Sequence, residues 1–142
     1  MRLHPQNKKI RMLRALPLFA DCKTRELAEV AAIADEIQLP AGRVMARENA
    51  EGGEFIVIAE GTAEVTAEVQ HGDQSIADLG PGDFFGEIAL VTGRRRNATV
   101  VATSPVRALV IEGHAFLSLL EHSPRIRARV ETAVAERLAR AS

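Results

Sequence analysis

Tryptophan and tyrosine are absent from this 142-residue chain, so it lacks the stacking platforms that single-strand nucleic-acid-binding proteins use. Its one cysteine, Cys22, excludes an intrachain disulfide and makes a reducing cytoplasm the expected location. No apolar run approaches the ~20 residues of a membrane-spanning helix. The N-terminus is polar and basic without a following apolar segment, so we expect neither a membrane span nor a signal peptide.

The patterns of common catalytic and metal sites are also missing. The histidines do not show the spacing by which β-rich cupin enzymes hold a metal; they are His4, His71, His114 and His122. The sequence has no G-x-S-x-G nucleophile elbow and no glycine-rich loop followed by lysine. We therefore expect no metal site and no enzymatic activity of the chain's own.

The composition that is present is typical of one small domain spanning residues 1–142. Hydrophobic residues make up 46% of the chain and aromatic residues 4%, so the core is expected to consist of Ala, Val, Ile and Leu. The net charge is −1, but residues 1–14 carry no acid and residues 123–142 hold five arginines against two glutamates. Such basic ends can contact nucleic acid, an anionic membrane or an acidic partner, although solvated helix faces are the simpler interpretation.

Hydrophobic periodicity divides the chain into three parts. Residues 7–35 read as helices, one over 7–16 stopped by Pro17 and one capped by Thr24. From residue 37 to 111 the period approaches two, with runs at 37–39, 44–47, 55–59, 63–69, 75–79, 98–102 and 106–111, separated by glycine-containing and Ser-Pro turns, including one at His71. Helices are predicted again over 115–140, the last one beginning at Pro124. This pattern predicts an α+β fold, an antiparallel, jelly-roll-like β-roll of about eight short strands flanked by N-terminal and C-terminal helices.

The segment from residue 80 to 102 is the most informative part of the sequence. A turn at Gly80–Asp83 leads to Phe84-Phe85, after which Gly86 relaxes the backbone and Glu87 begins a short helix that ends at Gly93. Amides at a helix start attract an anion, and Arg96 can close over the same anion with its planar set of donors. A carboxylate would repel that anion, so Glu87 is expected to accept hydrogen bonds from hydroxyls such as those of a ribose. Together these features indicate a nucleotide site.

This segment resembles the phosphate-binding cassette of the cyclic nucleotide-binding domains. The family pattern F-G-E-[ILM]-[AG]-L, followed by R-[SAT]-A-[TW]-V, is matched by residues 85–90 and, except at Asn97, by residues 96–100. Leu16-Pro17-Leu18-Phe19 and Glu60–Val65 resemble further family motifs, so the likeness covers roughly residues 12–138. It implies that Glu87 holds the ribose 2′-hydroxyl and that Arg96 and the amides near Gly86 hold the cyclic phosphate. The ligand-binding residues expected from this likeness are Phe85, Gly86, Glu87, Ile88, Ala89, Arg96, Asn97, Ala98 and Thr99.

Two departures from the family pattern leave alternatives open. Asn97 stands where the family usually has serine, threonine or alanine, and Arg94-Arg95 stands where a proline commonly precedes the arginine. We expect a cyclic nucleotide as the ligand, cAMP in preference to cGMP, and no other cofactor. The alternative is a degenerate domain that binds no nucleotide and serves as an interaction or dimerisation scaffold.

The last helix carries an apolar stripe at Ile126, Val130, Val134 and Leu138, which by itself indicates packing on the β-roll. The resemblance implies, as an alternative, that this helix moves as a lid when the ligand binds. No helix-turn-helix module follows that helix here, which argues against a DNA-binding regulator within these residues. The expected partners are therefore the nucleotide, an effector protein or fused effector domain, and, as a further option, a second copy in a homodimer.

Overall fold

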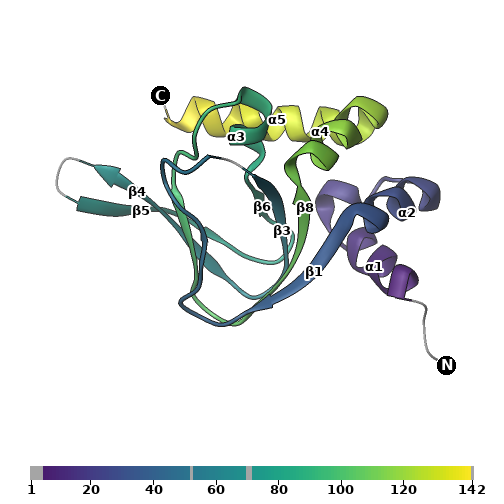
Figure 1. Cartoon of the computed structure of the whole chain (residues 1–142), viewed down its shortest axis with the longest axis horizontal. Coiled ribbons are helices and arrows are strands. Elements are labelled where there is room, and N and C mark those ends of the chain that lie inside the picture. Colours follow the sequence, from purple (N-terminus) through teal and green to yellow (C-terminus); the bar gives the residue numbers. More distant parts are fainter. Residues whose placement is uncertain (1–4, 52, 70–71, 142) are drawn as a thin grey trace.

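Helices at both ends of the chain enclose a set of β-strands in the computed structural model, which describes residues 5–51, 53–69 and 72–141 (Figure 1). The order of the described elements is α1 (Pro5–Arg14), the 3-10 helix η1 (Pro17–Phe19), α2 (Thr24–Ile33), β1 (Ala34–Leu39), β2 (Val44–Ala46), β3 (Glu54–Glu60), β4 (Ala63–Val69), β5 (Gly72–Leu79), β6 (Phe84–Phe85), α3 (Glu87–Thr92), β7 (Thr99–Ala102), β8 (Val106–Glu112), α4 (Gly113–His122) and α5 (Pro124–Ala141). The predicted α+β class and the flanking helices are confirmed.

The strands form two antiparallel sheets of four, in the orders β1-β8-β3-β6 and β2-β7-β4-β5. In the first sheet β3 pairs with β8, placing Phe55 opposite Ile111 and Val57 opposite Leu109. These four side chains belong to the core under the helices, whereas Ile56 and its neighbours in alternation belong to the core between the sheets. The nearly continuous hydrophobic run of β3 is thus explained, because both faces of the strand are buried.

The C-terminal helices close the core on the helical side of that sheet. Phe116 of α4 stacks on Phe55 of β3 with ring centroids 4.2 Å apart and planes at 15°. The apolar stripe predicted for the last helix is confirmed for Ile126, Val130 and Val134, all of which are buried. Leu138 is 39% exposed, so the stripe leaves the core before the helix ends.

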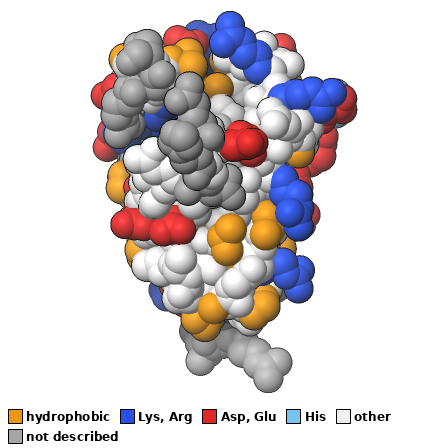
Figure 2. All heavy atoms as spheres, turned by 90° about the vertical axis from the view of Figure 1, so that its left-hand side faces the viewer, with side chains coloured by type: hydrophobic (Ala, Val, Ile, Leu, Met, Phe, Trp, Pro, Cys, Tyr) orange, Lys and Arg blue, Asp and Glu red, His pale blue; other side chains and the backbone are white. Residues whose placement is uncertain are grey.

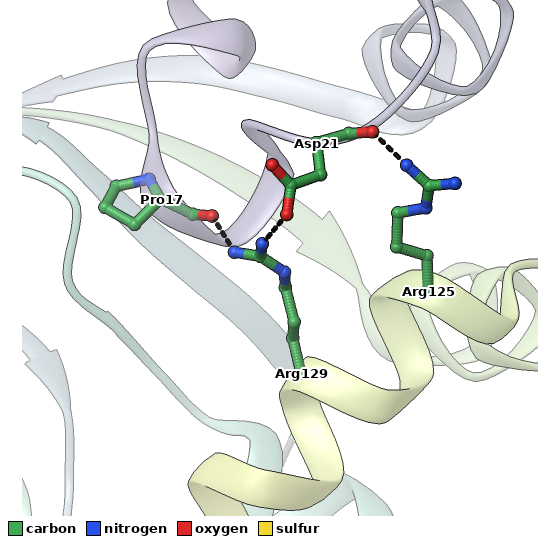
Figure 3. A network of polar contacts seen from close by, with 4 residues as sticks. All are labelled: Pro17, Asp21, Arg125 and Arg129. Atoms are coloured by element: carbon green, nitrogen blue, oxygen red, sulfur yellow. Dashed lines mark hydrogen bonds and ion pairs between the residues drawn. The ribbon is translucent and has the colours of Figure 1, made fainter.

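The first turns of α5 are tied to the N-terminal part of the chain by arginines (Figure 3). Arg129 donates to the carboxylate of Asp21 and to the carbonyl of Pro17, and Arg125 donates to the carbonyl of Asp21. The interpretation of the C-terminal arginines as solvated charges is therefore incomplete. Packing of α5 beside η1 brings carbonyl acceptors within their reach, which sequence spacing does not reveal.

Some local predictions require correction. The helix α2 begins at Thr24 itself, with Lys23 at the N-cap, whose amide donates to Glu26 Oε1 at 3.0 Å, while Thr24 Oγ1 accepts a hydrogen bond from Arg14. The first helix spans residues 5–14 rather than 7–16. The two-residue strand β6 was not predicted, because two residues are too few to show a period. The turn predicted at His71 lies outside the described residues.

Candidate functional site

The glycine before α3 is fixed by close contact with a neighbouring strand. Gly86 has φ 97°, and a Cβ added to it would stand 2.4 Å from the carbonyl oxygen of Glu54 in β3. Upstream, the predicted turn is confirmed, since the Asp83 amide donates to the Gly80 carbonyl at 3.0 Å and the Gly80 amide donates to Asp83 Oδ2 at 2.8 Å. The predicted helix from Glu87 ends before Gly93. Only glycine fits at position 86, because both the backbone conformation and the space exclude a side chain.

Backbone hydrogen bonds fix the position of Arg96, and its side chain extends from there toward Gly86. The Asn49 amide donates to the Arg96 carbonyl and the Arg96 amide donates to the Ala50 carbonyl, each at 2.8 Å. Asn49 has φ 70°, a left-handed conformation that asparagine tolerates. The guanidinium lies beside Gly86, and its Nη2 donates to the Glu54 carbonyl at 3.0 Å. Partial burial lowers the pKa of the Arg96 guanidinium, although the charges of Glu54 and Glu87 oppose this effect.

Glu87 is an acidic residue whose side chain lies in the interior, with 1% of its surface exposed. Its Oε1 accepts from Arg137 Nη1 of α5, and its Oε2 has no hydrogen-bond partner among the described residues. Burial raises the pKa of the Glu87 carboxyl above its usual value, while the charges of Arg137 and Arg96 act in the opposite direction. A buried carboxylate oxygen without a partner is costly, and this atom retains unused capacity to accept a hydrogen bond.

These groups face a cavity of about 480 Å³, a volume within the ~300–1,000 Å³ common for small-molecule sites. Eight of the nine expected ligand-binding residues line it, namely Phe85, Gly86, Glu87, Ile88, Ala89, Arg96, Asn97 and Ala98. Thr99 does not line the cavity. Its hydroxyl oxygen instead accepts a hydrogen bond from the Glu48 amide at 3.0 Å.

The opposite wall of the cavity comes from the second sheet. Apolar side chains of this wall include Val65 of β4 and Ile76 and Leu79 of β5. Ile76 is 55% exposed, and it lies at an irregularity of the β4–β5 pairing, where Val65 pairs with Ala77 and Thr66 with Ser75. Figure 2 shows the face that carries the β4–β5 hairpin, with Lys and Arg side chains along one edge and hydrophobic side chains beside them. The cavity thus has apolar side chains on the β4–β5 side and the ionisable side chains of Glu87 and Arg96 on the other.

Sequence reasoning missed Arg137, which also lines the cavity. Besides its pairing with Glu87, Arg137 Nη2 donates to the Phe84 carbonyl at 2.6 Å, and the guanidinium lies 4.9 Å from the centre of the Phe84 ring. In the sequence this residue is one of several arginines on the polar side of α5. Only the packing of α5 beside α3, visible in Figure 1, singles it out.

Among the described residues, no group of three or more His, Cys, Asp or Glu side chains is arranged to hold a metal ion. No helix in the described part of the chain combines the length and the apolar character needed to cross a bilayer.

Comparison with known proteins assigns the chain to a family. Residues 36–123 match the family described as "Cyclic nucleotide-binding domain", so the chain belongs to this family of regulatory domains. A cyclic nucleotide-gated potassium channel of Mesorhizobium japonicum is 33% identical over 115 residues, which are 81% of this chain and 31% of the channel. The chain therefore spans about a third of the length of that relative.

Solved structures agree with this assignment at the level of the fold. The regulatory domain of Toxoplasma gondii PKA with cAMP has a TM-score of 0.80 at 20% identity, covering 96% of this chain and 50% of that one. The regulatory subunit of a cAMP-independent protein kinase A from Trypanosoma brucei has a TM-score of 0.85 at 20% identity, covering 97% and 52%. The two-sheet arrangement with flanking helices is thus the β-roll of this family.

Proposed function

We propose that this chain binds a cyclic nucleotide, cAMP, in the cavity between the cassette at residues 80–102 and the β4–β5 wall. One observation carries the proposal. On either side of Gly86, a buried carboxylate with an unpartnered oxygen and a half-buried guanidinium face the same cavity. A ligand that fits both must present a hydroxyl donor and an anion close together, as the ribose and the cyclic phosphate of such a nucleotide do.

The proposed roles follow from where each group lies. Arg96 pairs with the cyclic phosphate, and the first-turn amides of α3 near Ile88 and Ala89, which have no intrahelical acceptors, supply further donors. Glu87 Oε2 accepts from the ribose 2′-hydroxyl. The base then lies toward the apolar wall of β4 and β5, with Asn97 at the exposed rim as a secondary polar contact.

The preference for cAMP rests on the polarity of the base region. The wall offers the apolar side chains of Val65, Ile76 and Leu79, with Asp78 as its charged member, and position 97 carries an amide in place of a hydroxyl that could meet a guanine edge. Guanine carries more polar groups along that edge than adenine, so it would leave more of them without partners there. We therefore propose that cAMP binds more tightly than cGMP.

The domain is proposed to act as a regulatory sensor in the cytoplasm without catalysis of its own. Its C-terminal helix α5 contributes Arg137 to the cavity and is the element through which occupancy reaches an effector. That effector is a separate protein or a domain fused to this one, as the length of the channel relative illustrates.

Thermal unfolding with and without nucleotides tests this function. A ligand that binds only the native state at 100 times its Kd adds ~2.7 kcal/mol to the free energy of unfolding. We expect cAMP to raise Tm in a concentration-dependent way and AMP to raise it less. If none of cAMP, cGMP and AMP changes Tm, the binding proposal fails.

One observation favours a second candidate, the nucleotide-free scaffold. Arg96 already donates to the Glu54 carbonyl and Glu87 already accepts from Arg137, so contacts within the protein use part of the hydrogen-bonding capacity of each side chain. A scaffold would be expected to unfold at the same temperature with or without nucleotides and to associate through its helices. The unpartnered Glu87 oxygen argues against this candidate.

A further inference from the structure

Arg137 is held at the cavity by contacts to two elements of the cassette. It pairs with Glu87 at the start of α3, donates to the carbonyl of Phe84 in β6, and lies over the Phe84 ring. Its side chain is 26% exposed. By contrast, Arg127 on the same helix is about half exposed and pairs with Glu131 one turn away, at 3.7 Å. Arg137 is therefore fixed by tertiary contacts, unlike an arginine on a solvated helix face.

Arg137 occupies one oxygen of the Glu87 carboxylate and leaves the other for a second donor. Arg137 uses Oε1, and the buried Oε2 has no partner among the described residues. A ligand hydroxyl that reaches Oε2 therefore does not compete with Arg137 for the same oxygen. The arrangement favours cooperation between the arginine and the ligand, because the two donors approach different oxygens.

The surrounding charges make Glu87 dependent on Arg137 once an anion is bound. Two cations act on the Glu87 carboxylate, Arg137 from α5 and Arg96 from the segment before β7. Under the proposed function, a phosphate group pairs with Arg96 and offsets its charge. Arg137 is then the cation that offsets the cost of keeping Glu87 ionised in the interior.

We propose that Arg137 is a positioning residue of the ligand site, which keeps Glu87 ionised and oriented so that its free oxygen accepts a hydroxyl of the cyclic nucleotide. This inference rests on the proposed function. It has a consequence for α5, because a contact that aids binding is strengthened in turn by the ligand. The start of α5 is anchored separately through Arg125 and Arg129 (Figure 3), so the C-terminal half of the helix is the part whose docking the ligand controls.

The test compares Arg137→Gln with the matched control Arg127→Gln, both titrated calorimetrically with cAMP and with 2′-deoxy-cAMP. We expect Arg137→Gln to weaken cAMP binding about ten-fold or more, as for loss of a hydrogen bond to a charged group, and to weaken 2′-deoxy-cAMP binding less. Arg127→Gln should match the wild type. In a Glu87→Gln background, Arg137→Gln should add little further loss.

The pH profile separates positioning from a merely structural role. Without Arg137 the pKa of Glu87 is expected to rise further, so Arg137→Gln should lose cAMP affinity on acidification at a higher pH than the wild type. Arg137→Lys keeps the charge and should restore most of the affinity and the wild-type profile. It also serves as the second variant if Arg137→Gln does not fold.

The following results would overturn the positioning role of Arg137 or the proposed function. Equal affinities of Arg137→Gln and Arg127→Gln overturn the inference, and tighter binding by Arg137→Gln shows that the arginine competes with the ligand instead. An Arg137→Lys variant as weak as one without the charge overturns the role of charge. If the wild type binds no cyclic nucleotide, the proposed function itself fails, a result distinct from these.

Discussion

Replacement of Arg96 by alanine removes the proposed phosphate partner while leaving the chain path in place. The backbone of Arg96 is held by hydrogen bonds to Asn49 and Ala50 that do not involve its side chain. The variant therefore deletes the guanidinium rather than the loop. A hydrogen bond to a charged group contributes ~1.5–3 kcal/mol, so cAMP affinity should fall by about 10- to 150-fold.

The matched control for this prediction is the neighbouring arginine. Arg95→Ala makes the same change of charge, but the Arg95 side chain is 65% exposed, its ion pair with Glu51 is long, at 3.9 Å, and its hydrogen bond to the Asn49 carbonyl, at 3.0 Å, is exposed. Its loss should alter affinity little beyond a salt-dependent effect. Isothermal titration calorimetry of both variants with cAMP measures the difference. Unchanged affinity in Arg96→Ala, or equal losses in the two variants, would refute the assignment of Arg96 to the phosphate.

Three further substitutions, two of them with a matched control, test the ribose contact, the close approach at Gly86 and the core. Glu87→Gln should reduce the preference for cAMP over 2′-deoxy-cAMP in competition titrations, and an unaltered preference would remove Glu87 from the ribose site. Gly86→Ala should lower the free energy of unfolding by ~1–3 kcal/mol or more and weaken binding, because the added methyl group meets both the strained φ and the Glu54 carbonyl. The control Gly93→Ala, at φ 72° with open space around it, meets the strained φ alone. Equal losses of the two variants in chemical denaturation would contradict the close approach at Gly86. Phe116→Ala should cost ~3–5 kcal/mol in the same denaturation assay while the exposed Leu117→Ala costs little, and similar values for the two would contradict the described core.

Much of the fold was predictable because its signals are local. The hydrophobic run of β3, the turn at Gly80–Asp83 and the stripe at Ile126 and Val130 depend on residues close in sequence, and each is confirmed. β6 escaped prediction because two residues show no period. Thr24 was misplaced as a cap because threonine is acceptable on either side of a helix start, and tertiary contact with Arg14 decided its role.

In the candidate site, too, residues close in sequence were predictable and contacts that depend on tertiary packing were not. Glu87 and Arg96 lie nine positions apart in one loop-and-helix segment, so their meeting at one cavity could be expected from spacing. Thr99 was expected there too, but the Glu48 amide takes its hydroxyl as an acceptor. Arg137 lies 50 residues from Glu87, and its place depends on how α5 packs over α3. No pattern within the helix distinguishes it from Arg127.

Calorimetric titration of the wild-type chain with cAMP, cGMP and AMP measures nucleotide binding without any substitution. We expect saturable binding of one cAMP per chain, weaker binding of cGMP, and AMP binding weaker than that of cAMP. Heat signals that show no saturation with any of the three nucleotides would contradict the proposed function.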